Sequence, residues 1–251
     1  TEARAVIEQA IPDDRKLNLV ISDKAIRRKA FRVGVLGEIR RGRSTVIERI
    51  VGVPIPALRE NGHSTLVQFG EPVELGSRLK GMAHGPAERV ELLVRCPWLK
   101  EHDLEIIEVA AFNAIDVPTV PPEWFDELDA ALLVVSAQQP LSRSELDRLD
   151  ELRNRHHVSH LAVVLTGSDR LERREAIDVI NDVRDTLQRA GSLVTLFDAS
   201  APPPALDGAA PLRVWLEEIS GPERVQHRAR QGAGQLKTLI DRLCHETLAE
   251  L

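Results

Sequence analysis

The stretch VGVLGEIRRGRSTVIERIVG, residues 33–52, joins an apolar strand to an amphipathic helix through a loop with two glycines. Four residues separate Gly37 from Gly42, and Arg43 and Ser44 follow, which is the spacing of a phosphate-binding loop. In such a loop, backbone amides and a helix N-terminus bind phosphate oxygens. Arg43 stands where lysine is usual, and its planar guanidinium is bulkier than an ammonium group. The stretch predicts a phosphate-loop fold; a strand–turn–helix corner without a ligand is the alternative.

Short apolar runs recur along the chain and alternate with polar, amphipathic stretches. Such runs are typical of strands buried on both faces of a mainly parallel sheet. We expect strands at residues 31–36, 66–69, 90–94, 104–109, 131–135, 161–165 and 193–197. The alternation predicts a doubly wound α/β fold. Together with the loop at residues 37–44, it predicts a P-loop type of mainly parallel sheet with helices on both faces.

Amphipathic helices are expected between these strands. One begins after Ser142 or Ser144 and has Leu146, Leu149 and Leu152 on one stripe. Another spans residues 171–190 and ends at Gly191, with inward-facing side chains at Ile177, Ile180, Val183 and Leu187. A further helix is expected at residues 211–219, which closes a domain of residues 31–220.

Both ends of the chain have helical patterns outside that domain. Residues 2–11 and 22–30 read as helices, and residues 223–250 form a charged helical segment that the sequence QGAG interrupts. Leu236, Leu239, Ile240 and Leu243 make an apolar stripe on this last segment. We expect residues 1–30 and 221–251 to form a small helical, neck-like appendage. Packing against a partner helix is favoured over membrane insertion, because the segment is both charged and amphipathic.

Composition limits the classes of function. The chain has 251 residues and a net charge of −6, which argues against a general nucleic-acid binder. No apolar run approaches the roughly 18 residues that span a bilayer, and no signal peptide is visible. Cys96 and Cys244 fit no metal-ligand spacing, so free thiols in a reducing cytoplasm are expected. The arginines around the loop predict either an anion site or a solvated face.

A working phosphate loop needs partner residues later in the chain. Thr65, with Ser64 beside it, is the candidate for a mobile-loop threonine that contacts magnesium and the γ-phosphate. Glu108 stands where an aspartate at a strand end would reach magnesium through water. Ala110 and Ala111 occupy the positions of a proline-glycine turn, so the amide that senses the γ-phosphate belongs to a residue with less backbone freedom than glycine.

A guanine-reading motif is expected after the strand at 161–165. Thr166 and Asp169 match its ends, and the Asp169 carboxylate is placed to pair with the N1 and N2 donors of guanine. Gly167 stands at the position of a lysine that covers the base, and it offers no side chain. Ser200 fits the weak final base-contacting motif.

Together these blocks resemble the GTPase domain of the dynamin superfamily, particularly bacterial dynamin-like proteins. The resemblance covers residues 31–220 and rests on an ordered series: GEIRRGRS, HST followed by QFG, IIEVAAF, DAALLVVSAQQPLSRSELDRLDEL and LTGSD. It implies that the terminal helices correspond to a neck bundle. It also implies GTP-driven dimerisation across the nucleotide and remodelling of membranes.

The predicted ligands are GTP or GDP with Mg²⁺. The nucleotide site comprises Gly37, Arg40, Arg41, Gly42, Arg43, Ser44, Thr45, Thr65, Glu108, Thr166, Asp169 and Ser200, with Ser44 and Thr65 as metal ligands. Because several family groups are replaced, we expect weak or absent hydrolysis. The expected partners are a second copy or another dynamin-like chain, with membrane contact through parts outside this chain, at the inner face of the cell membrane. A competent slow GTPase and a nucleotide-independent pseudoGTPase scaffold are the alternatives.

Three histidines, His156, His157 and His160, suggest a metal site as a further possibility. No acidic or cysteine partner stands at ligand spacing from them. Histidines at the C-terminal end of a helix, where they interact with its dipole, are the favoured interpretation.

Overall fold

The computed structural model describes residues 28–55, 64–71, 89–112, 123–191, 194–200 and 210–249. Within them, seven strands form one sheet in the order β3-β2-β4-β1-β5-β6-β7. β2 and β4 are antiparallel and the other neighbouring pairs are parallel, which confirms the predicted sheet. The strands are β1 (Phe31–Leu36), β2 (Ser64–Phe69), β3 (Arg89–Val94), β4 (Leu104–Glu108), β5 (Ala130–Ser136), β6 (His160–Thr166) and β7 (Thr195–Asp198).

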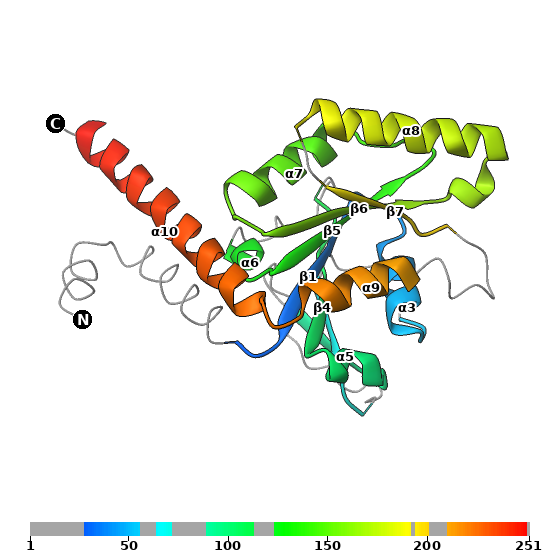
Figure 1. Cartoon of the computed structure of the whole chain (residues 1–251), viewed down its shortest axis with the longest axis horizontal. Coiled ribbons are helices and arrows are strands. Elements are labelled where there is room, and N and C mark those ends of the chain that lie inside the picture. The colour runs from blue at the N-terminus through cyan, green and yellow to red at the C-terminus, as the bar shows by residue number, and fades with distance from the viewer. Residues whose placement is uncertain are drawn as a thin grey trace.

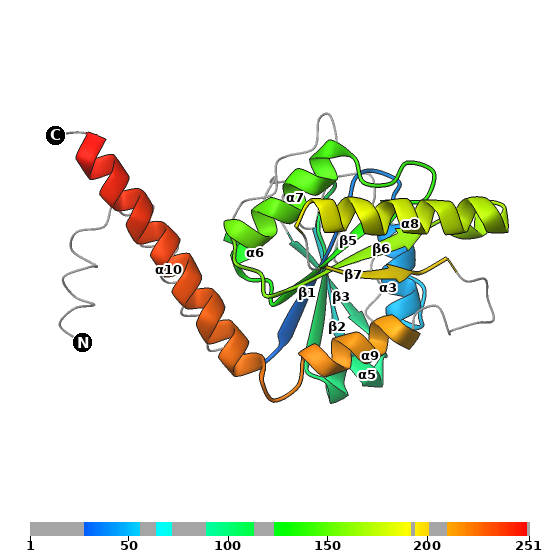
Figure 2. The same ribbon diagram turned by 45° about the horizontal axis from the view of Figure 1, so that its top comes forward.

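Helices cover both faces of this sheet, as Figures 1 and 2 show. They are α3 (Arg43–Val51), α5 (Pro97–Glu101), α6 (Glu123–Asp126), α7 (Arg143–Asn154), α8 (Arg173–Arg189), α9 (Ala210–Ile219) and α10 (Arg224–Ala249), with a 3₁₀ turn, η2 (Ser168–Arg170). The expected helices at 2–11 and 22–27 lie outside the described residues. Residues 28–30 are not helical, so that part of the prediction is wrong.

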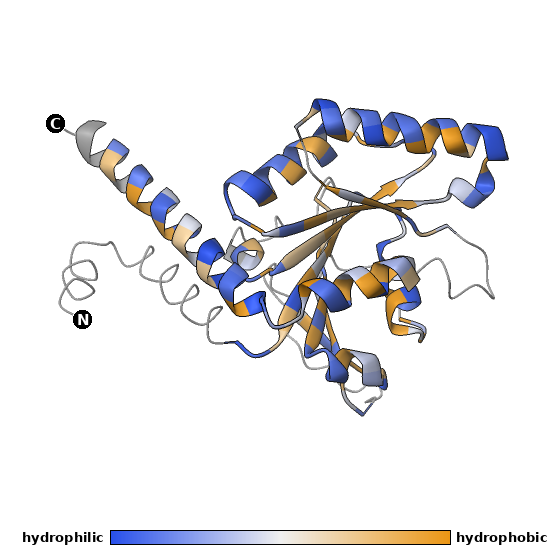
Figure 3. Ribbon diagram, viewed as in Figure 1, coloured by the Kyte–Doolittle hydropathy of each residue, from blue (hydrophilic) through white to orange (hydrophobic). Residues whose placement is uncertain are grey.

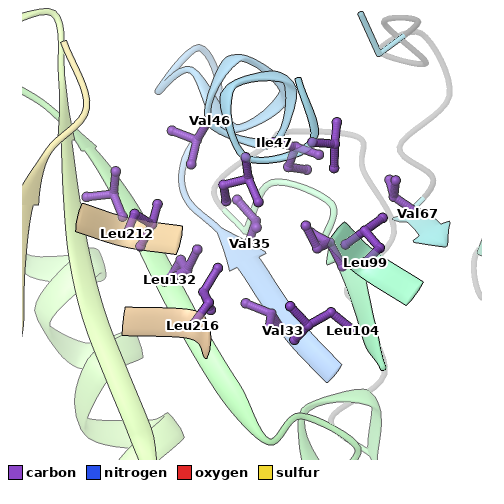
Figure 4. Packing of buried hydrophobic residues seen from close by; sticks show 14 of the residues in the cluster. Val33, Val35, Val46, Ile47, Val67, Leu99, Leu104, Leu132, Leu212 and Leu216 are labelled. Carbon is purple, nitrogen blue, oxygen red and sulfur yellow. The ribbon is translucent and has the colours of Figure 1, made fainter. Parts of the chain in front are cut away.

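The sheet separates two apolar cores, because successive side chains of a strand point to opposite faces. On one face, Val33 and Val35 of β1 join buried side chains of α3, α5 and α9. Figure 4 shows Val46 of α3 and Leu216 of α9 on this side of the strands. On the other face, Leu36 joins the buried side chains of α6, α7 and α8. Burial on both faces explains why the strands read as continuous apolar runs.

Two further predictions about helices need correction. Ile177 was expected to face inward, but it is 51% exposed, because α8 packs on the sheet through its second half, where Val183 and Leu187 are buried. The QGAG sequence was expected to interrupt the last helix, but α10 runs continuously through Gly232 and Gly234.

Helix α10 projects from the sheet domain in both views. It turns polar residues toward the domain, and Figure 3 shows its apolar residues in a separate stripe. Within the stripe, Val225, Leu236 and Ile240 are 64%, 39% and 45% exposed. The side chain of Leu243, predicted to belong to the stripe, lies outside the described residues. We call the contact between α10 and the domain the α10 seam.

Asp129, which precedes β5, anchors the first turns of α10. Its buried carboxylate accepts hydrogen bonds from Arg228 Nε and Nη2 at 2.5 and 2.8 Å, and from Arg28 Nη2 at 2.7 Å. The backbone amide of Arg32 donates to the same carboxylate at 2.7 Å. Arg228 also donates to the carbonyl of Ala30 at 2.6 Å, so residues 28–30 and α10 meet at one point.

The rest of the α10 seam is also polar. Gln235 donates to the carbonyl of His156 at 3.0 Å, and Gln231 donates to the carbonyl of Leu128 at 2.8 Å. The His157 ring lies 2.8 Å from Thr238 Oγ1. The His156 ring lies 2.7 Å from an Asp126 carboxylate oxygen. The described residues contain no group of three or more His, Cys, Asp or Glu side chains placed to hold a metal ion, and these histidines contact the seam or its supports.

The glycine at position 234 of α10 is explained by the His157 ring that packs against it. A Cβ atom there would lie 2.8 Å from the His157 ring, inside contact distance. We therefore expect Gly234→Ala to destabilise the fold by about 1–2 kcal/mol in urea unfolding, although alanine is the better helix former. Ala233→Gly at the exposed neighbouring position serves as control, with a cost of about 1 kcal/mol from helix propensity alone. An increase in stability for Gly234→Ala would contradict this packing.

His160 makes the fold sensitive to pH. Burial and the nearby His227 ring, at 4.6 Å between centroids, lower the pKa of His160 to about 4. The unfolded chain binds this proton with a pKa near the ordinary value of 6.5. The free energy of unfolding is therefore highest above pH 6.5 and decreases as the pH falls toward 4. We expect a loss of about 2 kcal/mol over that range, after allowance for solvent screening. His160→Gln should remove this part of the pH dependence of urea unfolding.

Candidate functional site

The predicted phosphate loop lies between β1 and α3, at the carboxyl edge of the parallel strands. Gly37 is required there because a Cβ atom would lie 2.6 Å from the carbonyl oxygen of Val134. Gly42 has a left-handed φ of 89° and its carbonyl accepts the first bond of α3, from Val46 N at 3.0 Å. Arg40 is also left-handed, with a φ of 61°. The strand–loop–helix predicted from residues 33–52 is confirmed.

Arg43 folds back across this loop. Its Nη1 donates a hydrogen bond of 2.6 Å to the carbonyl of Gly37, the first residue of the loop. Its Nε lies 3.7 Å from Glu108 Oε1 at the end of β4. The cation that stands in the lysine position thus contacts the loop's own backbone and an acidic neighbour.

Ser44 and Glu108 form the oxygen-rich part of the site. Ser44 Oγ donates to Glu108 Oε1 at 2.9 Å, which leaves the lone pairs of the hydroxyl oxygen available for a metal. Thr65 pairs directly with Glu108 between antiparallel strands, so their side chains share one face of the sheet. Hydroxyl and carboxylate oxygens are the ligands that Mg²⁺ prefers. These three residues therefore fit a magnesium ion.

Thr65 lies in β2 and is 3% exposed, so the expectation that it belongs to a mobile loop is wrong. Strand pairing with Glu108 fixes its backbone. Its neighbour Ser64 accepts a 3.1 Å hydrogen bond from the amide of Ala110, in the segment expected to replace the proline-glycine turn.

Arg41 was predicted to bind phosphate, but its side chain is buried beside α7. Its guanidinium pairs with Glu38 at 2.5 Å and with Glu145, in the first turn of α7, at 2.9 Å. Ser142 and Ser144 donate to the other Glu38 oxygen. A phosphate contact by this side chain requires these pairs to break. We call these five residues the loop–α7 cluster.

The environment separates the pKa values of the two glutamates in the loop–α7 cluster. Burial raises the pKa of Glu145, which is fully enclosed. Burial acts in the same direction on Glu38, but hydrogen bonds from Ser144, Ser142 and Arg41 outweigh it and lower the pKa of Glu38. The low pKa holds a negative charge on Glu38 next to Arg41.

The residues after β6 and β7 form the end of the site that is predicted to bind the base. Thr166 Oγ1 donates to the Arg41 carbonyl at 2.7 Å, which ties β6 to the phosphate loop. Gly167 is left-handed, with a φ of 77°, and no atom of the described residues lies within 4 Å of the place a Cβ would occupy. Asp169 is exposed in η2. Glycine at position 167 therefore leaves open the space that a base-covering side chain would fill.

Asp198 supports the residues after β6 and β7, and it was not predicted from the sequence. Its two carboxylate oxygens accept from Ser168 Oγ at 2.9 and 2.8 Å, and one of them accepts from the amide of Ser200 at 3.0 Å. Ser200 Oγ accepts from the amide of Ser168 at 2.9 Å. Ser200, predicted to contact the base, holds η2 in place. The DAS sequence after an apolar run, an Asx-turn pattern, was the available signal.

All the predicted site residues lie at one edge of the sheet, at the carboxyl ends of β1, β4, β6 and β7 or at the adjoining start of β2. Thr45 and Arg40 are exposed there. In open α/β sheets, this edge is where ligands bind.

Comparison with known proteins gives a structural match without a sequence match. Neither the protein-family models nor the curated proteins match this chain. Two solved structures, both described as an oligomerised bacterial dynamin pair that senses and tethers membranes over long range, match 98% of the chain with TM-scores of 0.59 and 0.60. The chain has the fold of the matched part of these bacterial dynamins. Sequence identities are 15% and 13%, and this chain covers 47% and 55% of those two chains, about half of their length.

The dynamin-like fold agrees with the resemblance inferred from the sequence blocks. It includes the mainly parallel sheet, the strand–loop–helix of residues 33–52 and the helices on both faces. Among the described residues, no helix is both long enough and apolar enough to cross a membrane. The domain limits at 31–220 remain a prediction, and α10 begins just beyond them.

Proposed function

We propose that this chain is a dynamin-like GTPase-domain protein with a degenerate nucleotide site and weak or absent GTP hydrolysis. It acts in membrane remodelling by associating with itself or with a partner dynamin-like chain. The observation that carries this proposal is the phosphate loop. The loop joins β1 to α3 as expected and has the Ser44–Glu108 oxygens beside it, but its cation is a guanidinium bonded to the Gly37 carbonyl.

Several groups at this edge are suited to guanine nucleotide. The amides of residues 42–45 at the start of α3 would bind phosphate oxygens. Ser44 and Thr65 would hold Mg²⁺, with Glu108 beside them, and the ion would neutralise charge on the phosphates. Asp169 would face the base, and Arg40, an exposed cation on the loop, would contact phosphate.

The same site disfavours efficient hydrolysis. Arg43 must leave the Gly37 carbonyl before it can reach a phosphate, and its fork does not match the space of a lysine ammonium. Ala111, which stands in place of the glycine whose amide senses the γ-phosphate, has less backbone freedom than glycine. Gly167 gives no cover to the base. Each of these departures removes a group or freedom that phosphoryl transfer or base recognition uses.

Partners and location follow from the structural relatives. Because those relatives are described as oligomerised dynamin pairs that tether membranes, we propose self-association or association with a second dynamin-like chain. Membrane contact would be peripheral, at the inner face of the cell membrane, through parts outside this chain. A net charge of −6 makes nucleic acid an unsuitable partner.

Calorimetric titration with GTP, GDP and a non-hydrolysable GTP analogue, with and without Mg²⁺, tests the proposal. We expect magnesium-dependent binding with a Kd between about 10 μM and 1 mM, and little phosphate release. Submicromolar binding with turnover would instead establish the competent GTPase. Absence of heat at millimolar nucleotide would establish the nucleotide-independent scaffold, which the internal pairing of Arg41 favours.

A further inference from the structure

The guanidinium of Arg43 is held between two fixed parts of the sheet domain. Its Nη1 donates to the carbonyl of Gly37 at 2.6 Å, and its Nε lies 3.7 Å from Glu108 Oε1. Gly37 directly follows β1, and Glu108 is the last residue of β4. A Cβ atom on Gly37 would lie 3.5 Å from Arg43 Cγ, so the aliphatic part of the side chain also rests on the loop.

The Glu108 carboxylate is well placed to hold this cation. The Arg43 and Glu108 side chains are each 16% exposed, and opposite charges attract more strongly where little water separates them. Ser44 Oγ donates to Glu108 Oε1 at 2.9 Å, and Glu108 pairs with Val35 between β4 and β1. The carboxylate is therefore fixed, and its charge favours the position of Arg43 against the loop backbone.

The other arginines of the loop do not replace Arg43. Arg41 pairs with Glu38 at 2.5 Å and with Glu145 at 2.9 Å, and its side chain is buried. Arg40 is exposed. Two of the three arginines at residues 40–43 are thus paired with carboxylates. The positive charge that the loop presents to a phosphate therefore depends on whether Arg43 leaves Glu108.

A held side chain lowers the apparent affinity of a site. A ligand binds in full strength only to the fraction of molecules in which the binding group is available, and the apparent affinity falls by that fraction. Arg43 must break its bond to the Gly37 carbonyl and leave the Glu108 carboxylate before it reaches a phosphate. Loss of the Glu108 charge should therefore raise the available fraction.

We propose that Glu108 is an inhibitory residue of the phosphate site, which holds Arg43 on the loop backbone and keeps this cation away from triphosphate groups. The ligand class is the triphosphate group, whether of a nucleotide or of inorganic triphosphate. The proposal deepens the proposed function and rests on it in one respect, that residues 37–44 bind phosphate. It gives Glu108 an effect on phosphate binding that is separate from its place beside the magnesium ligands.

Calorimetric titration with inorganic triphosphate in EDTA tests this role without metal. Glu108→Gln removes the charge, while its amide oxygen still accepts from Ser44, and we expect binding about 5-fold tighter than in the parent protein or more. Glu105→Gln is the matched control, because Glu105 lies on the same strand and pairs with Arg32; affinity should stay within about 2-fold of the parent. Titration with GTP in EDTA should show the same gain. A gain with GTP alone would assign the effect to the base and overturn the proposal.

A double substitution separates release of Arg43 from a simple loss of repulsion. Glu108→Gln also removes a negative charge near the ligand, which would favour any anion. The proposal requires Arg43→Gln with Glu108→Gln to bind triphosphate no better than Arg43→Gln alone, whereas a gain that persists without Arg43 would overturn it. If Glu108→Gln fails to fold, Glu108→Asp replaces it, because the shorter side chain draws the carboxylate away from Arg43. A gain of about 2-fold or more is then expected, and its absence would equally overturn the proposal.

The outcome is independent of the test of the proposed function. If the parent protein binds GTP with Mg²⁺ but Glu108→Gln gains nothing in EDTA, the inhibitory role of Glu108 is wrong and the proposed function stands. If the parent protein binds no GTP with Mg²⁺ but Glu108→Gln gains triphosphate binding that needs Arg43, the inhibitory role stands and the nucleotide-binding function is wrong.

Discussion

Asp129→Asn is expected to lower the free energy of unfolding by about 3–5 kcal/mol, because it removes the charge that two buried guanidiniums share. Arg228 and Arg28 have side chains only 6% and 12% exposed, and both donate to this carboxylate. An asparagine oxygen still accepts hydrogen bonds, but it leaves two positive charges without a counter-charge. Urea unfolding followed by circular dichroism at pH 7.5 measures the loss.

Asp147→Asn is the control for Asp129→Asn. Asp147 pairs with Arg143 on the surface of α7, where both side chains are mostly exposed, so its removal should cost less than about 1 kcal/mol. An equal, small effect of the two changes would contradict the anchoring role of Asp129. Spin labels at Cys244 on α10 and at a cysteine introduced by Asp178→Cys on α8 report the distance between the two helices. This distance, measured in the folded fraction of Asp129→Asn, would show whether α10 also leaves its position.

Arg43→Lys is expected to tighten binding of GTP with Mg²⁺ about 10-fold, as measured by calorimetry. The reason is geometric: the shorter, compact ammonium lacks the fork that spans the loop to the Gly37 carbonyl, and it suits the space between phosphates. Release of phosphate should rise less than binding, because Ala111 and Gly167 are unchanged. The departures at Ala111 and Gly167 still weaken hydrolysis and recognition of the base.

Arg49→Lys, the same substitution in the last turn of α3, should leave affinity unchanged. If Arg43→Lys binds no better than the parent protein, the departures at residues 108–111 and at Gly167 control affinity, and the guanidinium does not. A tighter complex would show that the loop is intact and that the cation limits it.

The sheet could be predicted from sequence because burial on both faces leaves a simple signal. Continuous apolar runs such as residues 131–135 allow few alternatives, and the glycines at 37 and 42 locate the loop between strand and helix. Structural comparison then supported the dynamin-like fold that the ordered blocks had suggested. These features depend on local sequence and on its period.

The contacts that hold the site depend on residues far apart in the chain, and local patterns do not reveal them. Glu145 looks like a solvent-facing helix residue in its sequence, yet it is fully buried against Arg41. Gly234 looks like a helix breaker, but it admits the His157 ring. Thr65 lies in a strand because β2 pairs with β4, a pairing that the sequence around Thr65 does not indicate.

The shape of α10 gives its polar attachment a geometric consequence. With 26 residues, the helix is about 39 Å long, and its end lies about 32 Å beyond the anchoring residue Arg228. A tilt of about 10° around that anchor would displace the far end by about 5–6 Å. Separation of a hydrogen-bonded seam exposes little apolar area, so water can replace most of the lost bonds. Small rearrangements near Asp129 would thus produce large displacements at the far end of α10.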